Sequence, residues 1–167
     1  MKLDSLEKLF VQELKDLYSA ETQLVKAIPR MESAATDRGL KDAFAHHLKE
    51  TEAHVHRLKS IFDGMNFEPG GHRCAAMEGI LKEGEELINN GAEPKVLDAA
   101  LIAAAQRVEH YEMAGYGTAR AYAEKLGHHE TADVLQQTLE EEGNANRALT
   151  RLAERSINAL AMFASAG

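Results

Sequence analysis

The stretch LKDLYSAETQLVKAI, residues 14–28, places an acidic residue in the middle of an apolar helical stripe. The stripe consists of Leu14, Leu17, Glu21, Leu24 and Ile28, and each member follows the one before by three or four residues. This spacing is typical of the face of an α-helix that packs against a core. Burying a carboxylate is costly unless it is paired, protonated or bound to metal. Glu21 therefore lies either at the stripe's edge, reaching solvent or an arginine, or in the core with a partner.

The second long helical segment repeats this pattern with histidines. His47, Glu50 and His54 are three and four residues apart, so they project from one side of a helix. The apolar residues Phe44 and Leu58 flank them. His54 follows Glu50 by four residues, and His47 precedes it by three, so either histidine is a candidate ligand beside Glu50.

The last two long segments carry further acids. Glu109 and Glu112 share one helical face beside Val108. In the final segment the stripe expected to face the core is interrupted by Glu141; its other members are Val134, Thr138, Ala145 and Leu152. The run of three glutamates at 140–142 is mostly a solvated face, from which one or two members point inward.

The hydrophobic periodicity predicts an all-α, single-domain chain over residues 1–167. We expect four long helices at about 4–37, 40–62, 94–126 and 131–159, with a shorter helix at about 75–88 between the second and third. Asp4 followed by Glu7 has the pattern of a capping box at the first helix. The sequence thus favours a four-helix bundle with one additional short helix.

The composition narrows the functional classes. The net charge of -8 argues against a phosphate-backbone nucleic-acid binder. The single cysteine, Cys74, excludes an intrachain disulfide and fits a reducing compartment. No apolar run is long enough to cross a membrane, and the N-terminus has no signal-peptide core. We therefore expect a cytoplasmic protein without a nucleic-acid or membrane partner.

Acids that point inward from all four long helices indicate a metal site, because like charges in a bundle core repel unless cations neutralise them. The candidate ligands are Glu21, Glu50, Glu109, Glu112, Glu141, His54 and His47. An oxygen-rich, nitrogen-poor set suits iron or manganese. We expect two iron ions, or manganese in their place, with zinc an alternative in isolated protein.

A faint internal duplication supports this reading. With one fixed offset, Glu21 falls on Glu112 and Glu50 falls on Glu141. The two helix pairs therefore carry carboxylates at matching levels.

Several of these motifs resemble the YciE/YciF family of bacterial ferritin-like stress proteins. They are LYSAE at 17–21, HLKET at 47–51, AMEG at 76–79, DAALIAAAQ at 98–106, VEHYE at 108–112 and TLEEE at 138–142. The resemblance implies a ferritin-like bundle, a di-metal site, dimers and expression linked to stress. The family's pattern transfers onto Glu21, Glu50, Glu109, Glu112 and Glu141, and His47 matches its motif. Where relatives often carry an acid after the last glutamates, this chain has Asn146.

Three functions are compatible with these residues. The first is a di-iron oxidoreductase, peroxidase- or ferroxidase-like, acting on peroxide or dioxygen and supplied with electrons by a donor protein in trans. The second is a non-catalytic stress protein whose metal is structural or sequestered. The third is a partner-binding module that uses the short helix around residues 77–81. In each case we expect a homodimer, because the short helix and the Ala-rich third helix offer apolar surface.

Overall fold

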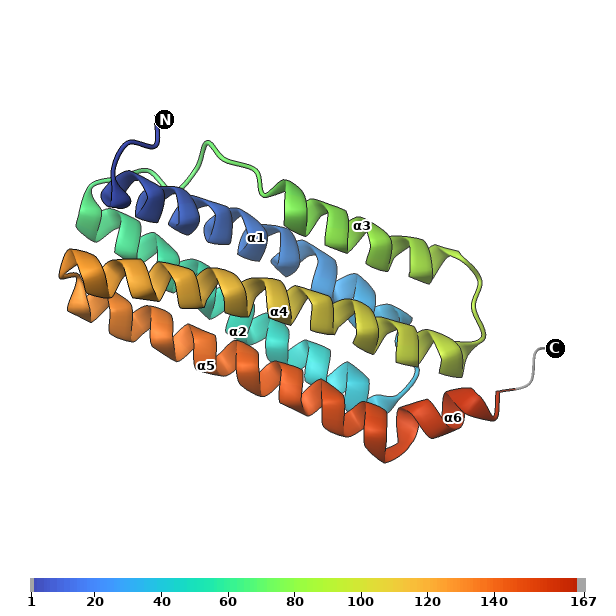
Figure 1. The fold of residues 1–167 in the computed structure, drawn as a ribbon. Coiled ribbons are helices and arrows are strands. Elements are labelled where there is room, and N and C mark those ends of the chain that lie inside the picture. Colours follow the sequence, from blue (N-terminus) through green and yellow to red (C-terminus); the bar gives the residue numbers. More distant parts are fainter. Residues whose placement is uncertain (1, 165–167) are drawn as a thin grey trace.

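The computed structural model describes residues 2–164, and within that range the regular structure is entirely helical. Four long helices form the bundle: α1 (Leu6–Ala34), α2 (Arg38–Met65), α4 (Pro94–Leu126) and α5 (His129–Leu152). The short helix α3 (Ala75–Asn89) packs against α1 and α4 on the outside of the bundle (Figure 1). The predicted four-helix bundle with an additional helix between the second and third long helices is confirmed.

The order of the helices requires one long crossover. In Figure 1, α2 and α4 run in the same direction, so the chain must return along the bundle between them. Helix α3 makes this return along α1. Bundles of the ferritin type share a single long crossover of this kind.

Polar side chains fix the start of α1 and the turn between α1 and α2. Ser5, and not Asp4 as expected, caps α1 by accepting from the Lys8 amide at 3.2 Å. Asp4 instead pairs with Lys8 Nζ at 2.5 Å. The turn between α1 and α2 is held by Asp98 of α4, which is buried and accepts from the amides of Thr36 at 2.6 Å and Asp37 at 3.0 Å. A buried carboxylate with this many donors is satisfied and needs no metal.

The C-terminal part differs from the single helix expected at 131–159. Helix α5 begins at His129 and ends at Leu152, where one π-helical turn, η1 (Ala153–Ile157), leads into α6 (Asn158–Met162). Leu160, Met162 and Phe163 are exposed at this end. Among the residues described, no helix combines the length and hydrophobicity needed to cross a bilayer.

The apolar core is divided into two clusters. One contains Leu24, Phe44 and Leu149, and the other contains Leu17 and Leu58. On α1 the two clusters meet at Ala20 and Leu17, beside Glu21, and on α2 they flank residues 47–54. The polar residues at the middle of the bundle are therefore enclosed by apolar side chains on both sides.

Candidate metal centre

Six ionisable side chains are buried in the middle of the bundle. Helix α1 contributes one, α2 two, α4 two and α5 one: Glu21, His47, His54, Glu109, Glu112 and Glu142. None is more than 7% exposed. Isolated buried charges are strongly disfavoured, so this cluster requires an internal balance of charge.

The potential ligand atoms fall into two groups that share one residue. His47, Glu109, Glu112 and Glu142 each offer an atom within 4.8 Å of the others, and so do Glu21, His54 and Glu142. Glu142 belongs to both groups. A carboxylate has two oxygens and can serve two neighbouring sites at once.

His54 turns one ring nitrogen toward the cluster. Its Nδ1 is 3.2 Å from Oε1 of Glu21 and 3.0 Å from Oε1 of Glu142. Burial alone would lower the pKa of His54, but hydrogen bonds and the charges of Glu142 and Glu21 raise it to about 11. Without another cation, His54 would therefore be protonated between these two carboxylates.

His47 lies at the other end of the cluster, two helical turns or about 10 Å along α2 from His54. Its Nε2 is 3.4 Å from Oε1 of Glu109 and 3.9 Å from Oε2 of Glu142. Burial lowers the pKa of His47, and the charge of Glu109 together with Glu50 and Glu142 raises it to about 9.

The two carboxyl groups of α4 have few compensating contacts. Burial and then the charges of Glu21 and Glu142 hold the pKa of Glu112 well above its usual range. Burial also raises the pKa of Glu109, although the neighbouring His47 opposes this. In the absence of a metal cation, Glu109 and Glu112 are expected to hold protons.

Many polar atoms of the cluster lack a well-aligned hydrogen bond. Among the residues described, these include both oxygens of Glu112 and Glu142, both ring nitrogens of His47, Oε2 of Glu21 and of Glu109, and Nδ1 of His54. Buried polar atoms are normally satisfied, and each exception calls for an explanation such as a bound ion. The four carboxylates and two imidazoles could therefore hold a metal ion.

The structure places Glu142, not Glu141, on the inner face of α5. Glu142 is fully buried, whereas the Glu141 side chain is 23% exposed. The buried positions of α5 are Ala132, Leu135, Thr138, Glu142, Gly143 and Leu149. The stripe predicted from the sequence included Thr138, which is buried, but took the residue three positions later, Glu141, rather than the one four positions later, Glu142. The internal duplication also favoured Glu141. Spacing from Thr138 and Leu149 is the signal that identifies Glu142.

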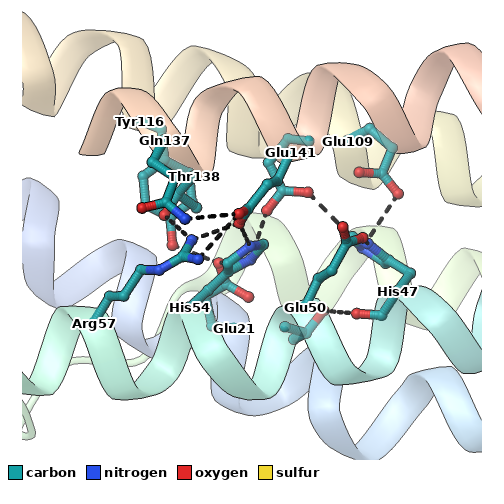
Figure 2. Close-up of polar contacts among 12 residues, drawn as sticks. Glu21, His47, Glu50, His54, Arg57, Glu109, Tyr116, Gln137, Thr138 and Glu141 are labelled. Atoms are coloured by element: carbon teal, nitrogen blue, oxygen red, sulfur yellow. Dashed lines mark hydrogen bonds and ion pairs between the residues drawn. The ribbon is translucent and has the colours of Figure 1, made fainter. Parts of the chain in front are cut away.

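Glu141 forms a bridge between the cluster and the surface (Figure 2). Its Oε2 is 2.9 Å from Nε2 of His54, and both its oxygens accept from the Arg57 guanidinium, at 2.5 and 3.0 Å. Burial would raise the pKa of Glu141, but hydrogen bonds from Arg57 and His54 lower it to about 2. Glu141 is therefore expected to carry a negative charge behind His54 at neutral pH.

Glu50 occupies the corresponding position behind His47. Its side chain is 23% exposed, with Oε2 at 3.6 Å from Nδ1 of His47 and Oε1 at 3.3 Å from Nε2 of His46. Glu50 and Glu109 therefore approach different ring nitrogens of His47, Nδ1 and Nε2 respectively. Glu50 thus lies at the edge of the cluster rather than among its buried acids.

Two tyrosines and the cysteine lie close to the centre. Tyr116 is buried and donates to Oε1 of Glu21 at 2.5 Å. Tyr111 donates to Asp16, and Sγ of Cys74 is 3.0 Å from the Tyr111 hydroxyl. Burial raises the pKa of the Cys74 thiol, so its place at the start of α3 does not make it a thiolate.

The family profile described as "Domain of unknown function (DUF892)" matches residues 5–162. The chain belongs to this family. Protein YciF of Escherichia coli (strain K12) is 41% identical over 159 residues, which cover 95% of this chain and 96% of YciF. The resemblance to the YciF family seen in the sequence is thereby confirmed.

Three solved structures agree with the fold. The crystal structure of the E. coli stress protein YciF superposes with a TM-score of 0.90 at 41% identity, over 93% of this chain and 99% of that one. YcfI of Rhodopseudomonas palustris gives 0.86 at 41% identity, over 90% and 97%. A protein from Xanthomonas campestris pv. campestris gives 0.75 at 17% identity, over 93% and 96%, which shows likeness of fold alone.

Proposed function

We propose that the buried cluster binds two iron or manganese ions, and that Glu142, which belongs to both groups of potential ligands, would help to hold both. The observation that carries this proposal is the set of unpartnered ligand atoms of Glu21, Glu112 and Glu142 at the centre of the bundle. Four carboxylates would balance the charge of two divalent cations. Zinc would fit the same residues in isolated protein, since it accepts imidazole and carboxylate ligands.

In this proposal the partly exposed acids Glu50 and Glu141 orient the histidines. Glu141 contacts the ring nitrogen of His54 that faces away from the cluster, and Glu50 lies on the corresponding side of His47. Carboxylates behind metal-binding histidines fix the ring and raise its basicity. Arg57 holds Glu141 in place with two hydrogen bonds.

The function that this site supports best is reduction of peroxide or dioxygen in a stress response. A pair of ferrous ions supplies the two electrons that cleavage of an O–O bond requires. The bundle itself keeps the ligands in fixed positions and encloses them in apolar side chains, which limits the access of water. The E. coli relative is described as a stress protein, which agrees with this assignment. A donor protein would return the electrons in trans, and catalysis would take place in the cytoplasm.

The test is anaerobic loading of the protein with two equivalents of ferrous ion, followed by mixing with hydrogen peroxide. Each peroxide takes up two electrons and two protons to give two waters, so one equivalent should oxidise both ions. We expect ferrous oxidation much faster than for free ferrous ion at the same pH. Glu112→Ala should remove most of this acceleration, whereas Glu140→Ala on the exposed face of α5 should not. Oxidation no faster than in solution would contradict the proposed reaction.

A further inference from the structure

A cavity of about 230 Å³ lies beside the His47 end of the cluster. Its walls come from α1, α2, α4 and α5 and are mostly apolar, with Leu24, Ile28, Phe44, Val108, Ala145 and Leu149 among them. It reaches the surface near His46, Asn144 and Arg151, which are exposed. The lining of the cavity thus includes both exposed residues and two residues of the buried cluster, His47 and Glu109.

One inner end of the cavity is polar. His47, Glu50 and Glu109 line it there. His47 is 7% exposed and Glu109 is 2% exposed, and both ring nitrogens of His47 and Oε2 of Glu109 have no well-aligned hydrogen-bond partner. A molecule in the cavity would therefore meet apolar side chains along its body and, at its tip, residues of the proposed metal centre.

The size and lining select a class of ligand. An engineered apolar cavity of about 150 Å³ holds benzene and stays free of water. The present cavity is larger than that, and it accommodates an aromatic ring or a branched alkyl group. Hydrogen peroxide is too small and too polar to gain from such walls, because the hydrophobic contribution grows with buried apolar area.

We infer that this cavity binds the organic part of a compact hydroperoxide, ROOH, whose peroxide group points toward His47 and Glu109. The inference rests on the proposed function and specifies its substrate class. In the reaction the O–O bond breaks, one oxygen leaves as the alcohol ROH and the other as water. The two electrons would come from two ferrous ions held at the same site, which would be oxidised to ferric, and the two protons from solvent.

Binding is tested without any reaction, using 2-phenylpropan-2-ol, the alcohol formed from cumene hydroperoxide. Titration of the metal-free and the zinc-loaded protein, followed by NMR, should give saturable binding with contacts from the probe's ring to the methyl groups of Val108 and Leu149. Ala145→Leu, which fills the cavity, should weaken binding ten-fold or more. Ala76→Leu adds the same groups to the exposed face of α3 and should leave binding unchanged. Absence of binding to the wild type, or contacts elsewhere, would overturn the inference.

Because Ala145 lies in the bundle, the melting temperature of Ala145→Leu shows whether the variant folds. If it does not fold, the NMR contacts mapped in the wild type alone test whether the probe binds in the cavity.

A kinetic experiment separates this inference from the proposed function. For the ferrous protein, the ratio of the rate with cumene hydroperoxide to that with hydrogen peroxide should fall about ten-fold in Ala145→Leu. Reaction with hydrogen peroxide but an unchanged ratio would contradict the cavity's role and leave the proposed function standing. No reaction with either peroxide would contradict the proposed function, while the binding data would still test the cavity.

Discussion

Oε2 of Glu141 lies 2.9 Å from Nε2 of His54, on the side of the ring opposite the buried carboxylates. Arg57 donates two hydrogen bonds to the same carboxylate from the surface side. The chain Arg57–Glu141–His54 therefore fixes the direction of Nδ1, which faces Glu21 and Glu142. In this arrangement Glu141 orients His54, whereas His54, Glu21 and Glu142 would bind the ion.

Glu141→Ala should weaken metal binding without removing a ligand. Loss of a carboxylate behind a metal-binding histidine costs about 10–100-fold in affinity. Competition against a chelator should show this loss, while the stoichiometry remains two ions per chain. Glu140→Ala, at the exposed neighbouring position, serves as the control. A stoichiometry of one ion in Glu141→Ala would show instead that Glu141 is itself a ligand.

The metal-free protein should become less stable as the pH rises above about 5. Burial and nearby acids raise the folded-state pKa of Glu112, so its folded state binds a proton more tightly than the unfolded state does. The associated stability is present below the unfolded value of 4.5 and is lost as the pH rises through the folded pKa. His47 adds a loss of the same sign between 6.5 and about 9.

Glu112→Gln removes the ionisable group from the centre of this cluster. The metal-free variant should be more stable than the wild type at pH 8, by on the order of 1–3 kcal/mol, and its stability should vary less between pH 5 and 8. Urea unfolding in the presence of a chelator measures both quantities. Added ferrous or manganous ion should raise the melting temperature of the wild type and much less that of the variant. A wild type that is more stable at pH 8 than at pH 5 without metal would contradict this account.

Helices α1 and α4 approach closely at Gly115. A Cβ atom there would lie 2.8 Å from Cδ2 of Leu17, which is buried in the core. Gly115→Ala should therefore destabilise the protein by about 1–3 kcal/mol, the usual cost of overpacking. Gly117→Ala is the matched control, since its Cβ would lie 3.9 Å from Leu139, and it should be neutral or stabilising by up to about 1 kcal/mol. Equal effects in thermal unfolding would show that Leu17 yields to the added methyl group.

We still expect a homodimer, but with the exposed C-terminal end rather than the short helix as the contact surface. Met77 of α3 is fully buried within the chain, while Met162 and Phe163 at the C-terminal end are 78% and 77% exposed. Light scattering should give twice the 18.3 kDa mass of the chain. Met162→Asp should shift the protein toward the monomer if this end forms the contact. An 18.3 kDa particle in the wild type at micromolar concentration would contradict the dimer.

The sequence predicts the helices, and the position of the acidic residues along the bundle, better than it predicts which acids point into the core. Glu21, Glu109 and Glu112 are buried as their spacing indicated, because they lie within unambiguous apolar stripes. On α5 the stripe drawn through Ala145 and Leu152 led to Glu141, whereas the spacing from Thr138 and Leu149, which are buried, leads to Glu142. The duplication paired Glu50 with Glu141, and the structure shows both as partly exposed acids beside a histidine.

Local chemistry explains the other differences. Ser5 and Asp4 are both good helix caps, and contact with Lys8 decides between them. The π-helical turn at Ala153–Ile157 changes the hydrogen-bond pattern without any proline or glycine to signal it. Arg57 had no sequence signal either, because its role depends on the position of Glu141 one helix away.

The most direct test of the metal centre is anomalous scattering from crystals of the metal-loaded protein, collected at the iron and manganese edges. The account predicts two peaks about 3–4 Å apart, the usual separation of paired ions. One should contact Glu21, His54 and Glu142, and the other His47, Glu109, Glu112 and the same Glu142. Peaks only at surface carboxylates, or none among these six side chains at full metal loading, would contradict the account.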